Sequence, residues 1–513
     1  MERAQGSSHD PSSHILVVGT GFAGLGMGIR LKKMGIETFT ILDEGEEVGG
    51  TWRDNHYPGA ACDVQSHLYS FSFEPNPHWS RQFAEQSEIY AYMRHCARKY
   101  GLYPHIRFGS RVVSARFDER AGLWTVETSK GERFVGRALI SGTGGLSKPS
   151  YPDIPGLGTF EKKAFHSARW DHSFDYRGKR VAVIGTGASA IQIVPELAKS
   201  AARVDLYQRT PPWILPKPDR AIGAAEKALY SLAPAAQWLH RQKIYWQNEL
   251  TCAGFVVDPR ILGVAERMAL SHLSRAVKDP ALREQLTPKY HIGCKRILLS
   301  NDYYPALQRP NVSLCTGGVA EVTKDAVVGK DGVRREVDAI VLCTGFSAAE
   351  QVAPFPVVGR GGVRLDEEWE PGAEAYLGTV VSGFTNFFTI VGPNTGLGHS
   401  SMIYMIESQI EYIAQCLEVL RERRLRYLDV KPEVQADHNV RLHARMAKTV
   451  WQTGCRSWYQ TSTGKNTTLW PGFTFEFRWA TRRPDLTCFE LAPELAVEAR
   501  ERARATNGRA ALA

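Results

Sequence analysis

Two glycine-rich turns have the residue types and spacing needed to hold dinucleotide phosphates. The first places Gly19, Gly21 and Gly24 between an apolar run that begins at Ile15 and a helical pattern over residues 25–34. In such a strand–turn–helix, the first glycine makes the turn, the second lets a pyrophosphate approach the backbone, and the third packs helix against strand. Free N–H groups at the start of the helix then favour the anion. We therefore expect a dinucleotide here.

The second turn repeats this pattern but differs at one informative position. Gly185, Gly187 and Ala190 follow a strand pattern over residues 180–184. Asp43 and Arg209 lie at the same distance after the third small residue of their respective turns, each at the end of a predicted strand. A carboxylate accepts hydrogen bonds from free ribose hydroxyls, whereas arginine binds a 2′-phosphate. The sequence therefore predicts FAD at the first turn and NADPH at the second.

A longer motif before the second turn carries a family resemblance. Phe160, His166, Trp170 and Asp171 match the fingerprint F-x-G-x-x-x-H-x-x-x-W followed by Pro or Asp, with Lys162 in place of the glycine. Over residues 15–483 the chain resembles the class B flavoprotein monooxygenases and, within them, the type I Baeyer–Villiger monooxygenases. Glycine tolerates a positive φ that strains lysine. The property that Lys162 is expected to change is therefore the local backbone conformation.

The resemblance implies a set of cofactor contacts. Residues 49–52 and 57–63 resemble the flavin-contacting loop of the family, and residues 392–402 resemble the loop that re-enters the flavin domain. The implied FAD-binding residues are Gly19, Gly21, Phe22, Ala23, Gly24, Asp43, Gly50, Thr51, Trp52, Asp63, Tyr69, Val112 and Met402. The implied NADP-binding residues are Thr186, Gly187, Ala188, Ser189, Ala190, Ile191, Gln192, Gln208, Arg209, Lys295 and Arg296.

The resemblance also implies a reaction and the residues that carry it. NADPH reduces the flavin, O₂ forms a C4a-peroxyflavin, and this attacks a ketone to give an ester or lactone. Arg296 is the expected catalytic cation, because its charge is permanent and it presents several donors to an anionic intermediate. Asp63 is expected to orient Arg296. His166 and Trp170 are expected to couple the position of NADP to domain movement.

Three other classes of protein are alternatives to this interpretation. An N- or S-oxygenating, or hydroxylating, flavin monooxygenase is the main alternative, although Arg296 and the tryptophan of the fingerprint argue against it. A pyridine-nucleotide disulfide reductase would need a CxxC or CxxxxC pair, which the sequence lacks. A non-catalytic redox sensor that binds FAD and NADP is the non-enzyme alternative.

The predicted fold class is α/β, with two Rossmann-like dinucleotide-binding domains and a helical insertion in the NADP domain. The insertion is expected from a stretch rich in Ala, Leu, Lys, Arg and Glu. The predicted boundaries are a disordered leader at 1–13, the FAD domain at 14–147 and 346–490, the NADP domain at 155–215 and 291–345, the insertion at 216–290 and a charged tail at 491–513.

Composition narrows the partners and the location. The net charge of +9 comes from scattered bases without a nucleic-acid-binding motif, so we expect no nucleic-acid partner. Nine dispersed cysteines without a CxxC pair argue against a disulfide framework, a structural zinc site and a dithiol redox centre, and they fit a reducing cytoplasm. We expect no metal, no membrane anchor, a cytoplasmic location, and O₂ and a small ketone as substrates. The particular ketone and the oligomeric state are not encoded in any motif.

Overall fold

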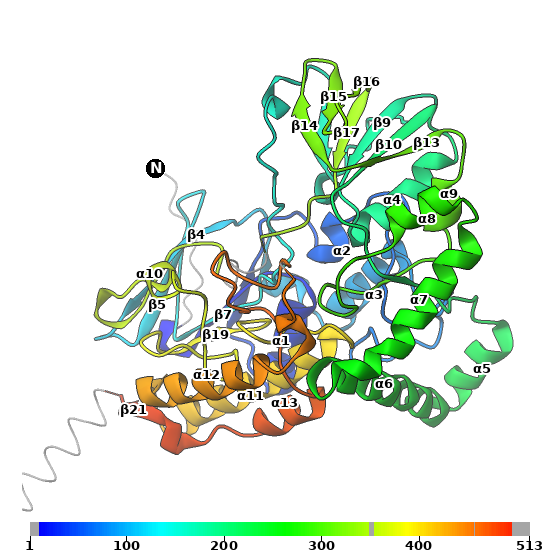
Figure 1. Ribbon diagram of the computed structural model, residues 1–513. Helices are drawn as coiled ribbons and strands as arrows, with labels where there is room; N and C mark the ends of the chain where they lie inside the picture. Colours follow the sequence, from blue (N-terminus) through cyan, green and yellow to red (C-terminus); the bar gives the residue numbers. More distant parts are fainter. Residues whose placement is uncertain (1–9, 348–352, 456, 495–513) are drawn as a thin grey trace, which may run out of the picture.

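The protein is described from a computed structural model that covers residues 10–347, 353–455 and 457–494 (Figure 1). Most of the predicted leader and tail falls outside these ranges. Within them, Pro11–Ser13 forms a 3₁₀ turn capped by the Asp10 side chain, and residues 491–493 are the end of strand β21 (Phe489–Pro493).

The first glycine-rich turn follows the central strand of a parallel five-stranded sheet. Helix α1 (Phe22–Lys33) begins directly after Gly21, three residues earlier than the apolar pattern predicts, because the turn itself supplies the start of the helix. The order of strands is β19-β7-β1-β2-β3. They are β1 (Ile15–Val18), β2 (Phe39–Leu42), β3 (Ile106–Arg107), β7 (Ala138–Ser141) and β19 (Phe387–Thr389).

The second turn has the same position in a second parallel sheet, at the upper right of Figure 1. The order of strands is β13-β10-β9-β17-β8, and helix α4 (Ala188–Ala198) follows β9. The strands are β8 (Lys163–His166), β9 (Arg180–Ile184), β10 (Arg203–Gln208), β13 (Val312–Thr316) and β17 (Ala339–Leu342). Two parallel sheets of this kind confirm the predicted α/β class.

Helices fill the segment between β10 and β13, as the composition predicts. They are α5 (Ala224–Leu232), α6 (Pro234–Val256), α7 (Gly263–Ala276) and α8 (Pro280–Leu286). Helix α6 runs along the lower edge of the molecule in Figure 1, next to α13 (Thr474–Ala480). Among the residues that the structure describes, no helix is both long enough and apolar enough to cross a bilayer.

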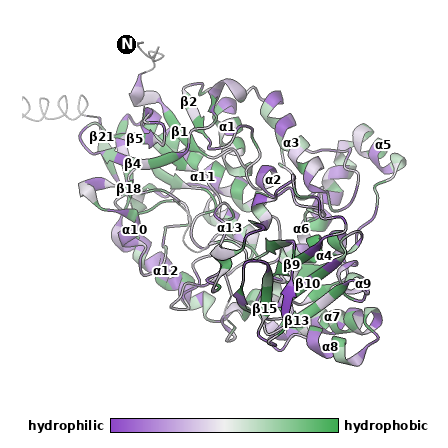
Figure 2. Ribbon diagram, turned by 90° about the horizontal axis from the view of Figure 1, so that it is seen from above, coloured by the Kyte–Doolittle hydropathy of each residue, from purple (hydrophilic) through white to green (hydrophobic). Residues whose placement is uncertain are grey.

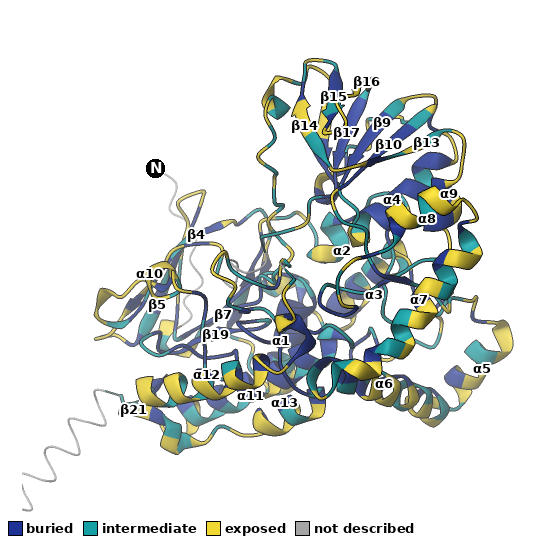
Figure 3. Ribbon diagram, viewed as in Figure 1, coloured by how far each residue is buried: buried dark blue, intermediate teal, exposed yellow. Residues whose placement is uncertain are grey.

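The core of the first sheet is closed by α11 (Met402–Glu422), which packs on α1. The sequence predicts that one apolar stripe of this helix faces the sheet, and all its members except the half-buried Met402 are buried: Ile406, Ile410, Ile413, Leu417 and Leu420. Full burial of each such side chain contributes about 1.5–3 kcal/mol. Figure 2 shows the hydrophobic residues of α11 and β1, and Figure 3 shows that the exposed residues of the helices face outward.

Two smaller sheets were not anticipated. One joins β4 (Val112–Asp118), β5 (Leu123–Thr128) and β6 (Arg133–Gly136) to β18 (Val357–Val358) beside the first sheet. The other is a meander of β14 (Val319–Val322), β15 (Ala326–Gly329) and β16 (Arg334–Glu336).

The expectation that the cysteines are unpaired is wrong at one place. Cys294 and Cys455 form a disulfide across a sequence separation of 161 residues, while the other seven cysteines are free. Spacing rules detect pairs that are close in sequence, and these two meet only because the chain folds back. The bond links the segment that carries Lys295 and Arg296 to the loop that precedes Trp458.

Candidate functional site

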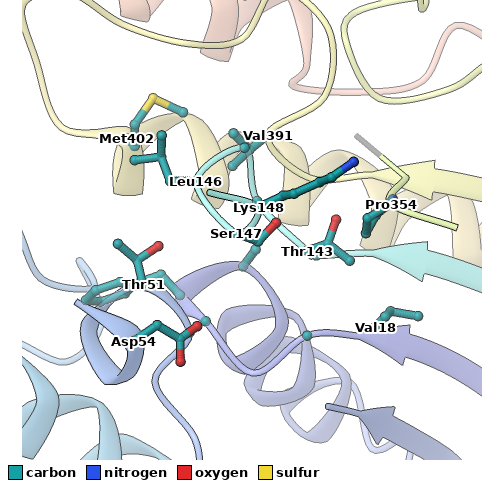
Figure 4. A pocket seen from close by; sticks show the side chains of 18 of the residues that line it. Val18, Thr51, Asp54, Thr143, Leu146, Ser147, Lys148, Pro354, Val391 and Met402 are labelled. Carbon is teal, nitrogen blue, oxygen red and sulfur yellow. The ribbon is translucent and has the colours of Figure 1, made fainter. Parts of the chain in front are cut away.

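A cavity of about 590 Å³ lies over the first glycine-rich turn. Figure 4 shows how it is assembled: Thr51 and Asp54 come from the short helix α2 (Thr51–Asp54), Lys148 from the loop after β7, and Met402 from the start of α11. Of the predicted FAD-binding residues, the lining includes Gly19, Gly21, Phe22, Ala23, Asp43, Gly50, Thr51, Trp52, Tyr69, Val112 and Met402. Arg296 also lines it, although it comes from the segment that leads into the second sheet.

The turn has a tight side and an open side, as a dinucleotide requires. A Cβ on Gly24 would lie 1.7 Å from the carbonyl oxygen of Gly19, so the helix packs on the strand only with glycine there. A Cβ on Gly21 would meet only the Cα of Gly50, at 3.9 Å. The space above Gly21, at the start of α1, therefore fits a pyrophosphate that approaches the backbone N–H groups.

Asp43 lies in the lining, but the protein itself already engages its carboxylate fully. Oδ2 accepts hydrogen bonds from the backbone N–H and the hydroxyl of Thr20, at 2.8 and 2.7 Å. Oδ1 accepts from the Gly45 N–H and from Arg53, both at 2.7 Å. Four acceptor positions are about all that a carboxylate offers. The predicted bond from a ribose hydroxyl to Asp43 thus requires one of these contacts to give way, and the Thr20 hydroxyl is the donor that can rotate.

Several lining residues were missed by the sequence analysis. Arg53 and Asp54 directly follow the 49–52 motif, Arg169 lies inside the fingerprint, and the others come from loops: Glu44, Ser110, Arg111, Thr143, Leu146, Ser147 and Lys148. Glu44 directly follows Asp43 and places a second carboxylate at the same corner. Its position at a strand end beside the glycine-rich turn was the one available signal.

Two segments near the C-terminal end of the described chain also reach the site. Trp458 and residues 467–469 line the cavity. Trp52 donates a hydrogen bond from Nε1 to the Tyr69 hydroxyl at 3.0 Å, and their rings meet edge to face. This contact fixes two predicted flavin-contacting residues relative to each other.

Arg296 and Asp63, which are far apart in sequence, form an ion pair at the cavity. Nε and Nη2 of Arg296 donate to Oδ2 of Asp63 at 3.0 and 2.5 Å. Burial favours the neutral acid, but the Arg296 guanidinium outweighs it and lowers the pKa of Asp63. In turn, the charge of Asp63 raises the pKa of Arg296. Both groups therefore remain charged, and a permanent cation is held at the wall of the cavity.

The second turn presents an accessible helix N-terminus. Gly187 and Ala188, at the start of α4, are exposed, and the Thr186 hydroxyl donates to the carbonyl of Thr210 at 2.9 Å. Gln192 has a different role: it donates from Nε2 to the Ala61 carbonyl and accepts from the Tyr57 hydroxyl, both at 2.9 Å. Gln192 therefore connects α4 to the predicted flavin-contacting loop.

Two cations lie close together at the end of β10 without a balancing carboxylate. Arg209 is exposed and Lys295 is half-buried. Burial lowers the pKa of Lys295, and the positive charge of Arg209 lowers it further. Neither has an ion-pair partner in the described part of the chain. Gln208 is buried and donates to the Gln285 carbonyl, so it supports the strand end rather than facing solvent. Two uncompensated cations form a site for an anion such as a phosphate.

His166 and Trp170 occupy different surroundings. His166 ends β8 and is fully buried; its ring lies 5.7 Å from those of Tyr151 and Phe346, which belong to the two connections between the sheets. Burial lowers the pKa of His166 to about 4. Trp170 instead packs edge to face on Phe165 at 5.2 Å, within the core of the second sheet.

The departure at Lys162 causes no backbone strain. Lys162 is not among the non-glycine residues with positive φ. Its ammonium group donates to the Val337 carbonyl at 2.8 Å and lies 3.4 Å from Asp338. Lysine is thus accommodated just before β8, where it contacts the two residues that precede β17.

Two Rossmann-like sheets, a cavity over the first turn and a basic corner on the second define a flavoprotein oxidoreductase that uses a pyridine nucleotide. A sequence profile described as pyridine nucleotide-disulphide oxidoreductase matches residues 16–223, a range that excludes both disulfide-bonded cysteines. A Baeyer–Villiger monooxygenase of Pseudomonas aeruginosa is 48% identical over 95% of this chain and 94% of its own length. Another, from Streptomyces coelicolor, is 50% identical over 93% of this chain and 92% of its own length.

Solved structures agree with these relatives. A steroid monooxygenase bound to NADP superposes with a TM-score of 0.83 at 30% identity, covering 94% of this chain and 99% of that one. The cyclohexanone monooxygenase of Rhodococcus sp. Phi1 bound to NADP⁺ superposes with a TM-score of 0.85 at 27% identity over the same shares. The chain belongs to the Baeyer–Villiger monooxygenase family, and the family predicted from the sequence is confirmed.

Proposed function

We propose that this protein binds FAD at the first turn and NADPH at the second, and inserts one oxygen atom next to the carbonyl of a small-molecule ketone to give an ester or lactone. Bound FAD supplies the electron transfer and the activation of O₂. The protein supplies two nucleotide sites, a shaped cavity and a fixed positive charge. The observation that carries the proposal is the Arg296–Asp63 ion pair at the wall of the cavity.

Arg296 is the proposed catalytic residue. Attack on a ketone carbonyl creates an oxyanion, and a guanidinium that keeps its charge stabilises this anion without giving up a proton. Asp63 anchors Nε and Nη2 and leaves Nη1 without a protein partner in the described part of the chain. Asp63 is therefore a positioning residue that fixes the direction of the remaining donors.

Arg209 and Lys295 are proposed to bind the 2′-phosphate that distinguishes NADPH from NADH. Their proximity without a carboxylate raises the free energy of the nucleotide-free protein, and a phosphate dianion relieves that repulsion. Thr186 and the residues at the start of α4, Gly187 to Ala190, are proposed to receive the pyrophosphate, while Ile191 and Gln192 follow on the same helix.

His166 is proposed to transmit the position of NADP to the connections between the two sheets. Its ring contacts both connections, and these meet each other through a bridge between Pro149 and Phe346. Trp170 is proposed to hold the fingerprint segment in the core of the second sheet rather than to touch substrate. We also propose a cytoplasmic location, because seven of the nine cysteines are free thiols.

A ketone panel tests the function. The purified protein, supplied with FAD and NADPH, is incubated with linear, cyclic, aromatic and steroid-like ketones, and also with a sulfide and a tertiary amine. We expect ketone products that gain one oxygen atom, with NADPH consumed in proportion. Oxygenation of only the sulfide or amine would indicate the alternative monooxygenase class. Cofactor binding without any product would indicate a redox sensor.

A further inference from the structure

Helices α6 and α13 expose a broad apolar face that the proposed reaction does not use. More than half of the large hydrophobic side chains that are exposed in the described part of the chain lie on residues 229–270, and others lie on α13. We define the apolar face by Leu239, Trp246, Leu250, Phe475 and Trp479; Leu250 and Trp479 are each 74% exposed. Soluble proteins rarely expose so many large apolar side chains together unless the surface binds a protein, a membrane or a ligand.

Helix α6 is apolar on both sides. Its inner side buries Ile244, Tyr245 and Phe255 against the rest of the protein. Leu239, Trp246 and Leu250 follow one another at spacings of seven and four residues, which places them on a single stripe on the opposite side. The outward stripe therefore adds nothing to the core of this chain.

The two helices present one continuous surface. The rings of Trp246 and Phe475 lie 6.1 Å apart, which joins the stripe of α6 to the exposed side of α13. Both helices lie along the lower edge in Figure 1, and Figure 3 shows exposed residues on them there. The apolar face is thus spread over two helices on one side of the molecule and is not confined to a groove.

The charges on this surface are cations. Lys243, Arg478 and Arg482 are exposed and have no ion-pair partner among the described residues. The only carboxylate of α6, Glu249, is buried and hydrogen-bonded to Thr474. The only carboxylate of α13, Glu476, is paired with Arg445. Exposed Trp and Leu side chains with uncompensated Lys and Arg are the composition of a helix that lies in the interface of an anionic bilayer.

The pattern on α6 does not suit a second copy of this helix. A paired-helix seam needs apolar residues at alternating spacings of three and four. Between Leu239 and Trp246 those positions are occupied by Gln242 and Lys243. A lysine at the border of the stripe would face its symmetry mate across a dimer seam, whereas at a lipid surface it meets headgroup phosphates.

We propose that the apolar face docks the protein on the surface of an anionic phospholipid bilayer, with the leucine and tryptophan side chains among the upper acyl chains and Lys243, Arg478 and Arg482 at the phosphates. Docking of this kind lies in the plane of the interface and needs no membrane-crossing helix.

Vesicle co-sedimentation tests this proposal. The full-length protein loaded with FAD is mixed with phosphatidylcholine vesicles, with or without phosphatidylglycerol. We expect wild type to sediment with the vesicles that contain phosphatidylglycerol, and the bound fraction to fall when salt is added. The double variant Leu239→Asp/Leu250→Asp should bind these vesicles at least about tenfold more weakly than wild type, because it removes two inserted apolar side chains. Lys243→Glu should weaken binding to the anionic vesicles alone.

Val333→Asp is the matched control, because Val333 is an exposed apolar residue in the turn between β15 and β16, far from α6. It should sediment like wild type. Flavin content and melting temperature, measured for every variant, show whether the fold is intact. Equal vesicle binding by the double variant and wild type would overturn the proposal. So would a dimer in light scattering that the double variant converts to a monomer, because a second copy would then cover the face.

Discussion

Arg296 meets Asp63 through a single carboxylate oxygen: Nε at 3.0 Å and Nη2 at 2.5 Å both donate to Oδ2. The two residues come from segments 233 positions apart in the chain. A guanidinium anchored by one edge keeps a fixed orientation, and its other donors remain available at the wall of the cavity. This relationship explains why the cation can act on an anion in the cavity and yet keep its own charge.

Replacing Arg296 should separate oxygenation from NADPH oxidation. Loss of a donor to a developing oxyanion typically lowers the rate about 10²–10³-fold. We expect Arg296→Ala to form ester more slowly by this factor, while NADPH still reduces the flavin. Arg296→Lys should recover part of the loss, because it keeps a charge but not the forked geometry. Product yield per NADPH is the measurement. Arg364→Ala, at a surface arginine paired with Asp366, is the control and should behave as wild type.

Arg209 should determine the preference between the two nicotinamide cofactors. A hydrogen bond to a charged group is worth about 1.5–3 kcal/mol, which corresponds to roughly 10–100-fold in affinity. Arg209→Ala should raise KM for NADPH by that order and leave KM for NADH nearly unchanged. Arg177→Ala removes an exposed arginine of the same sheet region that is already paired with Asp175, and should alter neither value. An equal effect on both cofactors would show that Arg209 does not contact the 2′-phosphate.

His166 should act through the connections between the sheets and not as a proton donor. We expect His166→Ala to retain FAD but to slow flavin reduction or to uncouple NADPH oxidation from product. Burial lowers the pKa of His166 to about 4, so the ring is neutral throughout the physiological range. The pH profile of flavin reduction should therefore show no step near 6.5 that disappears in His166→Gln. Unchanged NADPH kinetics and coupling in His166→Ala would contradict the proposed role.

The same histidine predicts how stability depends on pH. Because its folded-state pKa of about 4 lies below the unfolded value near 6.5, the unfolded chain takes up the proton first as the pH falls. The contribution of His166 to the free energy of unfolding is therefore constant above pH 6.5, falls between pH 6.5 and 4, and levels off below pH 4. Denaturant titrations of wild type and His166→Gln at pH 7.5 and pH 4.5 should show a smaller loss in the variant. Equal losses would mean that His166 contributes nothing to acid sensitivity.

The disulfide should stabilise the arginine-bearing segment. A cross-link of Cys294 to Cys455 restricts the unfolded chain, and native disulfides typically contribute about 2–4 kcal/mol. We expect Cys455→Ser to lower the melting temperature, and a reducing agent to lower that of wild type but not of the variant. Cys488→Ser, at a free cysteine, is the control. Peptide masses measured without reduction should contain the linked pair.

The sequence was sufficient to predict the features that depend on local spacing. These features are the glycine-rich turns, the stripe of α11 from Ile406 to Leu420 and the helical insertion. Each depends on residues that are close in sequence, and the structure agrees with each of them. What it could not provide depends on distant segments. The contact of Gln192 with the flavin loop and the Cys294–Cys455 bond form only when segments far apart in the sequence are brought together.

Gly187 and Gly185 test whether the second turn binds a pyrophosphate or is only a structural bend. Gly185 has a φ of +110°, and a Cβ there would lie 2.3 Å from the Cys343 carbonyl oxygen, so Gly185→Ala should destabilise the fold. A Cβ on Gly187 would meet nothing within 4 Å, so Gly187→Ala should keep the wild-type melting temperature. If phosphates approach this turn, that methyl group would stand in their way, and KM for NADPH should rise by about tenfold or more. No other role of this exposed glycine depends on the absence of a side chain, so a raised KM in a folded protein would point to contact with the phosphates. An unchanged KM in a fully folded Gly187→Ala protein would place the nucleotide elsewhere.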